Sequence, residues 1–204
     1  NPTRPSAVRV AAMALFSRRK DPVVALVHLN ARLQPKHRGS AFEDPLDELL
    51  AQHAPGSEVV GGGTQFTPDT GPLSCDIEVS LAGDPARTLA LVVDMLEHLG
   101  APIGSWAQLP GGAQHPFGVT HGLALALDGT SLPDEVYADN DVNDLIAALD
   151  DALGASATLL SWWEGPQLTV LFYYGRDPGR MHAVLSSAAN LSPLSQGSTV
   201  TSIT

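Results

Sequence analysis

The sequence predicts an α+β protein of tandem ferredoxin-like (βαββαβ) repeats, in which antiparallel sheets carry their helices on one face. Two segments indicate this fold: residues 75–100 and residues 168–190 each run from a strand through an Asp-Pro helix start into a helix. In both segments an arginine follows the proline by two residues, and the surrounding elements come in the same order. One continuous α+β domain is the alternative.

The first half opens with a strand and a loop. Residues 23–33 are rich in β-branched and aliphatic side chains, which is typical of a strand. One face of this strand is apolar, and the other turns polar at His28, Asn30 and Arg32. Residues 34–43 predict a loop, because a proline and a glycine interrupt them.

Asp44 followed by Pro45 predicts the start of a short helix over residues 44–53. Residues 57–66 predict a strand whose glycines, Gly61–Gly63, produce a bulge or allow a close backbone approach. They do not match a phosphate-binding loop, because no helix start follows them. The half ends with an alternating strand at 74–82, a helix from Asp84-Pro85 to Gly100, and a strand at 104–109.

The second half repeats this order. Its predicted elements are a strand at 122–129, a helix at 142–153 capped by Asp141, a hairpin of 157–163 and 167–174, a helix opened by Asp177-Pro178, and a strand at 198–203. The predicted boundaries are a basic extension at 1–20, a first repeat at 21–109, a linker at 110–118 and a second repeat at 119–204. Met13 is a plausible native start, which would make residues 1–12 upstream or added sequence.

The second sheet is predicted to be apolar on both faces. Leu168, Val170, Phe172 and Tyr174 fall on one face of a strand, and the largely apolar residues between them fall on the other. Trp162 and its neighbour Trp163 must also point to opposite faces. A wide exposed apolar face is a liability or a binding site, so we expect this sheet to be covered by its helices and by the other half or another chain.

Composition argues against several classes of protein. The 22 acidic residues outnumber the 11 Lys and Arg, for a net charge of −11, which disfavours nucleic acid and anionic membranes as partners. The single cysteine, Cys75, excludes an intrachain disulfide and a cysteine-rich metal site, fits a reducing cytoplasm, and is expected to be an inert buried thiol. No apolar run reaches the length of a membrane helix, and no motif indicates a cofactor, a metal or catalytic residues.

The polar face of the first sheet is the first candidate site. His28, Arg32, Asp76 and Glu78 could converge there, since cross-strand neighbours lie close together. A histidine beside carboxylates can act as a base or a metal ligand. A solvated face of mixed charge is the alternative.

Two further groups are candidates for binding. The loop residues Lys36, His37 and Arg38, with Arg32 before them, could receive a phosphate, a carboxylate or an acidic segment; self-pairing with the following acids, Glu43 and Asp44, is the alternative. The aromatic residues of the second half, including Trp162 and Tyr174, suit a recognition surface, with core packing as the alternative. Arg87 and Arg180 are expected to pair with Asp84 and Asp177.

Five short motifs resemble an uncharacterised family of small bacterial proteins. They are residues 28–35, 43–46, 61–64, 75–78 and 99–102. Some members of that family accompany secreted toxins, as immunity proteins would. The resemblance covers only residues 22–109, and its motifs carry no assigned catalytic residues.

These observations lead to a non-catalytic binding protein, and an immunity-type inhibitor of a basic protein partner is its most concrete form, because an acidic surface accelerates capture of a basic one. The first alternative is a small-molecule sensor or enzyme with its site on the polar face of the first sheet. The second alternative is a structural homodimer joined through the aromatic second sheet.

Overall fold

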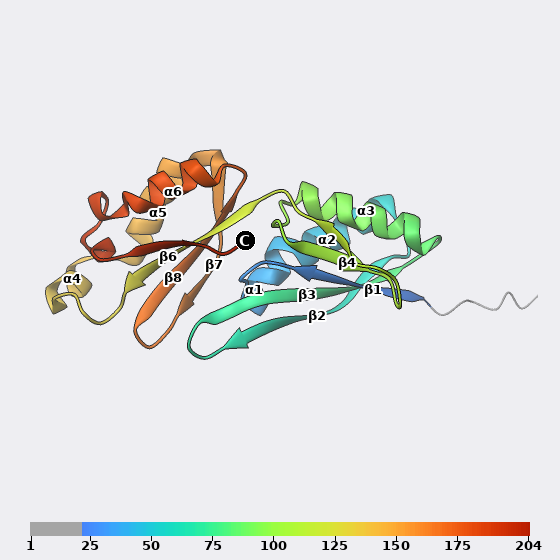
Figure 1. Ribbon diagram of the computed structural model, residues 1–204, viewed down its shortest axis with the longest axis horizontal. Helices are drawn as coiled ribbons and strands as arrows, with labels where there is room; N and C mark the ends of the chain where they lie inside the picture. The colour runs from blue at the N-terminus through green and yellow to red at the C-terminus, as the bar shows by residue number, and fades with distance from the viewer. Residues whose placement is uncertain (1–21) are drawn as a thin grey trace, which may run out of the picture.

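A computed structural model describes residues 22–204 of the chain. The predicted native start at Met13 and the whole basic extension at 1–20 lie outside these residues. The described part is an α+β structure with a five-stranded and a four-stranded sheet, both antiparallel. The helices lie on one face of each sheet (Figure 1), so the predicted fold class is confirmed at this level.

The first half contains nine elements. They are β1 (Val23–Leu29), α1 (Pro35–Arg38), the π-helical turn η1 (Gly39–Glu43), α2 (Asp44–His53), β2 (Glu58–Thr67), β3 (Gly71–Leu81), α3 (Pro85–His98), β4 (Ser105–Gln108) and β5 (His115–Phe117).

The second half contains ten. They are β6 (His121–Asp128), α4 (Asp134–Asp139), α5 (Val142–Leu153), η2 (Gly154–Ser156), β7 (Ala157–Glu164), β8 (Leu168–Gly175), α6 (Pro178–Ser186), η3 (Ala188–Asn190), η4 (Pro193–Ser195) and β9 (Thr199–Ser202).

Strand order is similar in the two sheets. The first runs β2-β3-β1-β4-β5 and the second β7-β8-β6-β9. In both, the first strand of the half lies between the third and the fourth, which is compatible with a ferredoxin-like order. That the halves arose by duplication stays a prediction, as do the domain boundaries.

The predicted loop at 34–43 is wrong, because this segment is helical. Gln34 is the extended N-cap residue, and Pro35 occupies the first turn. Asp44, predicted as a cap, has helical backbone angles (φ −63°, ψ −48°) and lies inside a continuous helical segment. The π-helical turn ends at Glu43, two residues before Pro45, whose nitrogen cannot donate a backbone hydrogen bond.

The predicted linker at 110–118 also contains structure. Residues His115–Phe117 form β5, which pairs with β4 at the edge of the first sheet. Pro116 is tolerated there, because an edge strand has one side without a partner. The glycines and prolines around this short strand are typical of a loop, so the sequence does not predict it.

Three predicted helix caps are confirmed, but the arginines near two of them do not form the predicted ion pairs with the capping aspartates. Asp84 accepts a hydrogen bond from the backbone N–H of Arg87, and Asp177 accepts one from that of Arg180. Within residues 22–204 neither arginine side chain forms an ion pair. The side-chain oxygens satisfy free N–H groups of the first turn, as capping residues do. Asp141 caps α5 in the same way.

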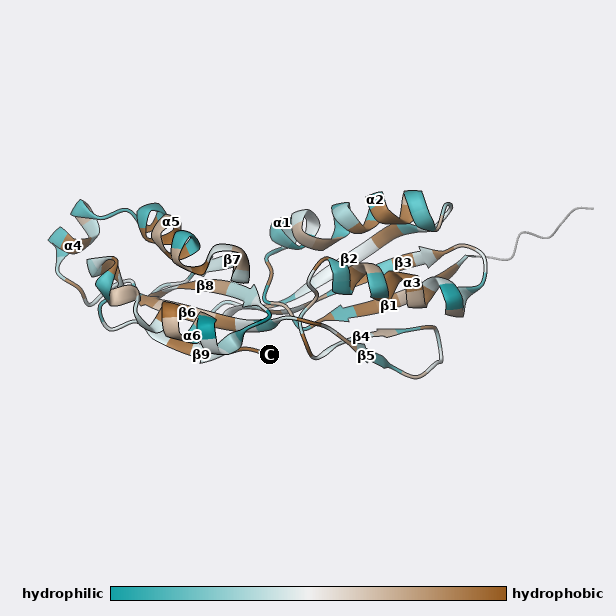
Figure 2. Ribbon diagram, turned by 90° about the horizontal axis from the view of Figure 1, so that it is seen from above, coloured by the Kyte–Doolittle hydropathy of each residue, from teal (hydrophilic) through white to brown (hydrophobic). Residues whose placement is uncertain are grey.

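Hydrophobic residues form two buried clusters, and one of them joins the halves. Figure 2 shows that hydrophobic stretches follow the strands, whereas α4, which buries no side chain, is largely hydrophilic. The first cluster lies in the first half but includes Ala124, Phe172 and Tyr174 of the second. The other lies between the second sheet and its helices. The second sheet is therefore covered by its helices on one face and, at one end of the other face, by the first half, so the predicted double coverage holds for that end. No helix in the described part of the chain is both long and apolar enough to span a membrane.

Candidate functional site

Tyr174, on the face of β8 that points away from the helices, holds the two halves together. The Tyr174 hydroxyl is buried and accepts a hydrogen bond of 2.7 Å from the backbone N–H of Arg32. Burial raises the pKa of Tyr174, so the hydroxyl stays neutral. Strand β8 is buried on both faces from Leu171 to Gly175 and becomes more open toward Leu168. The first half thus covers only one end of this face.

A second set of contacts joins α1 to β7. The buried Ser161 hydroxyl oxygen accepts a hydrogen bond of 3.2 Å from the backbone N–H of Gln34 and lies 2.8 Å from His37 Nδ1. The His37 ring also lies against Trp162, with 5.9 Å between ring centroids. Burial and the neighbouring Lys36 ammonium lower the pKa of His37.

A groove of 550 Å³ opens beside this junction, over the uncovered part of the second sheet. Its floor follows the strand register: Val170, Ala126 and Thr199 form one row across β8, β6 and β9. In the next row Ala124 lies between Phe172 and Thr201. The central strand β6 turns leucines toward its helices and short alanines toward this face, and the short side chains leave space for the groove.

Hairpins from both halves form the walls of the groove. Asp69 and Thr70 come from the β2–β3 turn, residues 165–167 come from the β7–β8 turn, and Leu168 is the first residue of β8. Trp163 packs edge-on against Phe66 at 4.8 Å. It also lies over Gly71, where a Cβ atom would come within 2.4 Å of the indole. Gly71, with φ +74°, thus allows the two hairpins to approach each other.

Arg32 is the cationic residue of the groove. Its guanidinium lies 6.0 Å from the centre of the Phe172 ring, and its side chain is partly exposed. Within residues 22–204 no carboxylate lies within 4.0 Å of it. Arg32 ends the polar row that begins at His28, so one predicted residue of the polar face contributes to the groove instead.

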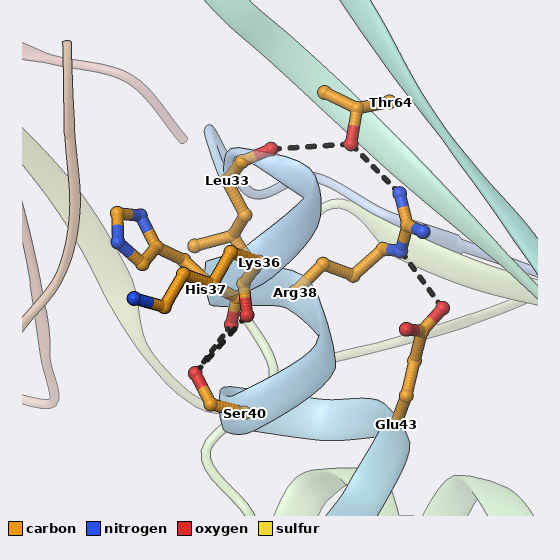
Figure 3. A network of polar contacts seen from close by, with 7 residues as sticks. All are labelled: Leu33, Lys36, His37, Arg38, Ser40, Glu43 and Thr64. Atoms are coloured by element: carbon orange, nitrogen blue, oxygen red, sulfur yellow. Dashed lines mark hydrogen bonds and ion pairs between the residues drawn. The ribbon is translucent and has the colours of Figure 1, made fainter.

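The other basic residues of the predicted loop do not converge on one patch. Arg38 is buried, donates to Glu43 at 2.8 Å and to the Thr64 hydroxyl at 2.8 Å, as Figure 3 shows. The self-pairing alternative is therefore confirmed for Arg38. Lys36 is exposed, and His37 faces the junction.

The glycine-rich strand accommodates this buried pair. A bulge falls between Val59 and Gly61, and a Cβ at Gly62 would come within 2.4 Å of a Glu43 carboxylate oxygen. Both predicted roles of the glycines are confirmed. Cys75 is buried, which raises its pKa to about 12 and keeps it an unreactive thiol, as expected.

The polar face of the first sheet brings together part of its predicted set. His28 Nδ1 lies 2.8 Å from an Asp76 carboxylate oxygen, and the two residues are direct partners across β1 and β3. Trp106, which the sequence reasoning missed, stacks on the His28 ring at 5.1 Å. The alternation in residues 105–108 could have placed it on this face. Glu78 is exposed beside Gly61 and lies next along β3 on the same face. No group of three or more His, Cys, Asp or Glu side chains suited to a metal occurs in the described residues.

Trp162 lies at a different cavity, of 820 Å³, on the helix side of the second sheet. Carboxylates line it, but several have structural roles. Asp128 accepts hydrogen bonds from the backbone N–H groups of Thr130 and Ser131, which lower its pKa. Asp141 caps α5. Trp162 and Tyr174 therefore belong to separate places rather than to one aromatic surface.

Comparisons with known proteins add little to this geometry. No family model and no curated protein matches the chain. Among solved structures, the chain is similar to the regulatory subunit of aspartate kinase from Thermus thermophilus, in its ligand-free form, at 13% sequence identity. The alignment covers 84% of this chain and 94% of that chain, with a TM-score of 0.25. A likeness this weak carries no argument about fold or function, and the resemblance to immunity-like proteins stays a prediction.

Proposed function

We propose that this protein is a small-molecule sensor whose ligand binds in the groove between the two halves. The observation that carries the proposal is a guanidinium, that of Arg32, without a carboxylate partner in the described part of the chain, at a groove of 550 Å³ with an apolar floor. Small-molecule sites are concave, mostly apolar, and contain a few polar groups that fix orientation.

The position of the groove suits a sensor. Residues of both hairpins line it, so a bound ligand would contact both halves at once. A ligand that binds better to one arrangement of two parts shifts the population toward that arrangement. Binding would therefore stabilise the junction that Tyr174 and Ser161 already hold.

This proposal develops the first alternative from the sequence, a small-molecule sensor, and not the immunity-type inhibitor. The site moves from the middle of the polar face to its end at Arg32. Nothing in the comparisons supports an inhibitor of a basic protein. A homodimer through the aromatic face is disfavoured, because Phe172 and Tyr174 are already buried within the chain. The similar strand orders and the Asp-capped helices support descent from one duplicated unit, which remains part of the proposal.

Thermal unfolding in the presence of a metabolite library tests the proposal. A ligand present at about 100 times its dissociation constant adds about 2.7 kcal/mol of stability, which raises the melting temperature. We expect at least one compound to stabilise the wild-type protein and to lose its effect on Ala126→Leu, which fills the groove floor. Arg87→Gln, on the exposed start of α3, should respond like the wild type. A library without such a compound, or hits unaffected by filling the groove, would contradict the proposal.

A further inference from the structure

We propose that the ligand of the groove is a small monocarboxylate with an unbranched aliphatic chain. This inference rests on the proposed function and specifies the chemistry of the same site. It follows from three properties of the groove: one free guanidinium, an uncharged floor, and a carboxylate at the rim.

The guanidinium is placed to receive a carboxylate. The Arg32 guanidinium carbon lies 6.0 Å from the centre of the Phe172 ring, and no carboxylate of the described residues lies within 4.0 Å of this side chain, so its N–H groups are available to a ligand. These N–H groups form a planar fork that matches the two oxygens of a carboxylate. The backbone of Arg32 is fixed by its hydrogen bond to Tyr174, so the side chain starts from a defined position. An ammonium head group would be repelled, and a neutral oxygen would gain only a single, weaker hydrogen bond from this contact.

The floor suits a hydrocarbon chain. The two rows that cross β8, β6 and β9 contain no charged side chain: Val170, Ala126 and Thr199 in one, and Phe172, Ala124 and Thr201 in the other. Leu168 and Trp163 extend the apolar lining. The alanines of β6 give a shallow channel in the centre of the sheet, which suits a narrow unbranched chain better than a bulky ring.

The rim limits the charge of the ligand. Asp69 is the acidic residue among those that line the groove, and it lies in the exposed β2–β3 turn. A second carboxylate on the ligand would meet this charge without a second cation to balance it. The site is thus expected to prefer monocarboxylates over dicarboxylates of the same length.

Calorimetric titration with butanoate, hexanoate and octanoate tests the chain preference. Each added methylene that reaches the apolar floor should tighten binding about four-fold. Octan-1-ol, octylamine and octanedioate, which match octanoate in length, should bind more weakly than octanoate. Arg32→Gln should weaken octanoate binding about 10- to 150-fold, the range for a hydrogen bond to a charged group, and should weaken octan-1-ol binding far less. Arg87→Gln, which removes the same charge elsewhere, should bind octanoate like the wild type.

The outcomes separate this inference from the proposed function. Equal binding of octanoate and octan-1-ol, or no effect of Arg32→Gln, would overturn the monocarboxylate inference. If another class of compound binds and loses binding in Ala126→Leu, the sensor proposal stands and the ligand class is wrong. If neither the carboxylates nor the library bind, both are wrong. Circular dichroism of each variant establishes that a loss of binding is not a loss of fold.

Discussion

Tyr174 and Tyr173 are adjacent residues with opposite roles. The Tyr174 hydroxyl accepts the Arg32 N–H across the junction. The Tyr173 hydroxyl lies on the helix side, is buried and has no hydrogen-bond partner in the described part of the chain. Burial and the nearby Asp150 carboxylate raise the pKa of Tyr173, so it too stays neutral. The same substitution at the two positions should therefore have different effects.

Tyr174→Phe should lower the free energy of unfolding by about 1–3 kcal/mol, because it leaves a partly buried N–H of Arg32 without an acceptor. Tyr173→Phe removes only a hydroxyl without a partner and should be neutral or stabilising. Urea unfolding of both variants measures the difference. Equal losses at the two positions would mean that the hydrogen bond at the junction contributes nothing.

His37 should make the junction sensitive to pH. The Ser161 oxygen accepts from Gln34, and His37 Nδ1 is the acceptor within reach of the Ser161 proton in the described residues. If Ser161 donates this proton, Nδ1 is the unprotonated nitrogen of the neutral ring, in keeping with the lowered pKa of His37. Among the described residues, the charged group that acts on His37 is the ammonium of Lys36, on the same helix. Its positive charge also disfavours the imidazolium.

A histidine with a lowered pKa in the folded state binds fewer protons there than in the unfolded chain, so stability rises with pH. The contribution of His37 should be complete above its ordinary pKa of 6.5 and decline as pH falls below that value. Urea unfolding between pH 5 and 8 should show a smaller pH dependence for His37→Asn than for the wild type. An unchanged pH dependence would rule out this role.

At the scale of elements, the sequence predicts the long strands and the three Asp-capped helix starts, and it misses the short strand β5 and the helix start before Pro35. The positions within residues 74–82 and 167–174 predict which face each side chain occupies. In β8 the two faces separate as expected, because Phe172 and Tyr174 belong to one buried cluster and Leu171 and Tyr173 to the other. A helix start is less certain, because Gln34-Pro35 and Asp44-Pro45 both resemble one and only the first begins the helix. The groove was beyond sequence reasoning, because it joins Arg32 to residues 163–170 and 199–201 through tertiary packing.

The contact of β2 with η1 gives a test at this scale. Gly62→Ala would place a methyl group 2.4 Å from a Glu43 oxygen and 2.8 Å from the Asp76 carbonyl oxygen, so it should destabilise the protein by about 1–3 kcal/mol. Gly63→Ala meets no atom within 4 Å and should be neutral or stabilise by up to about 1 kcal/mol. Thermal unfolding compares the two. A neutral Gly62→Ala would show that η1 moves away from the strand freely.

At the scale of the whole molecule, the first half covers only part of the face of the second sheet that points away from its helices. The first half covers the end of the second sheet at Tyr174 and buries most of the row of Phe172 and Ala124, whereas the next row, that of Val170 and Ala126, stays more open. Double coverage of the second sheet could be predicted from its apolar faces. The part of the face that stays open depends on how far the β2–β3 hairpin extends over the second sheet. The alternation of side chains along a strand does not predict that distance.

The most direct test follows alanine methyl signals by NMR during a titration with octanoate. We predict that the methyl groups of Ala124 and Ala126 shift together with the side-chain Nε–H of Arg32, whereas the methyl group of Ala138, at the acidic cavity near Trp162, does not. Shifts confined to Ala138, or no shifts at saturating octanoate, would contradict a carboxylate site in the groove between the halves.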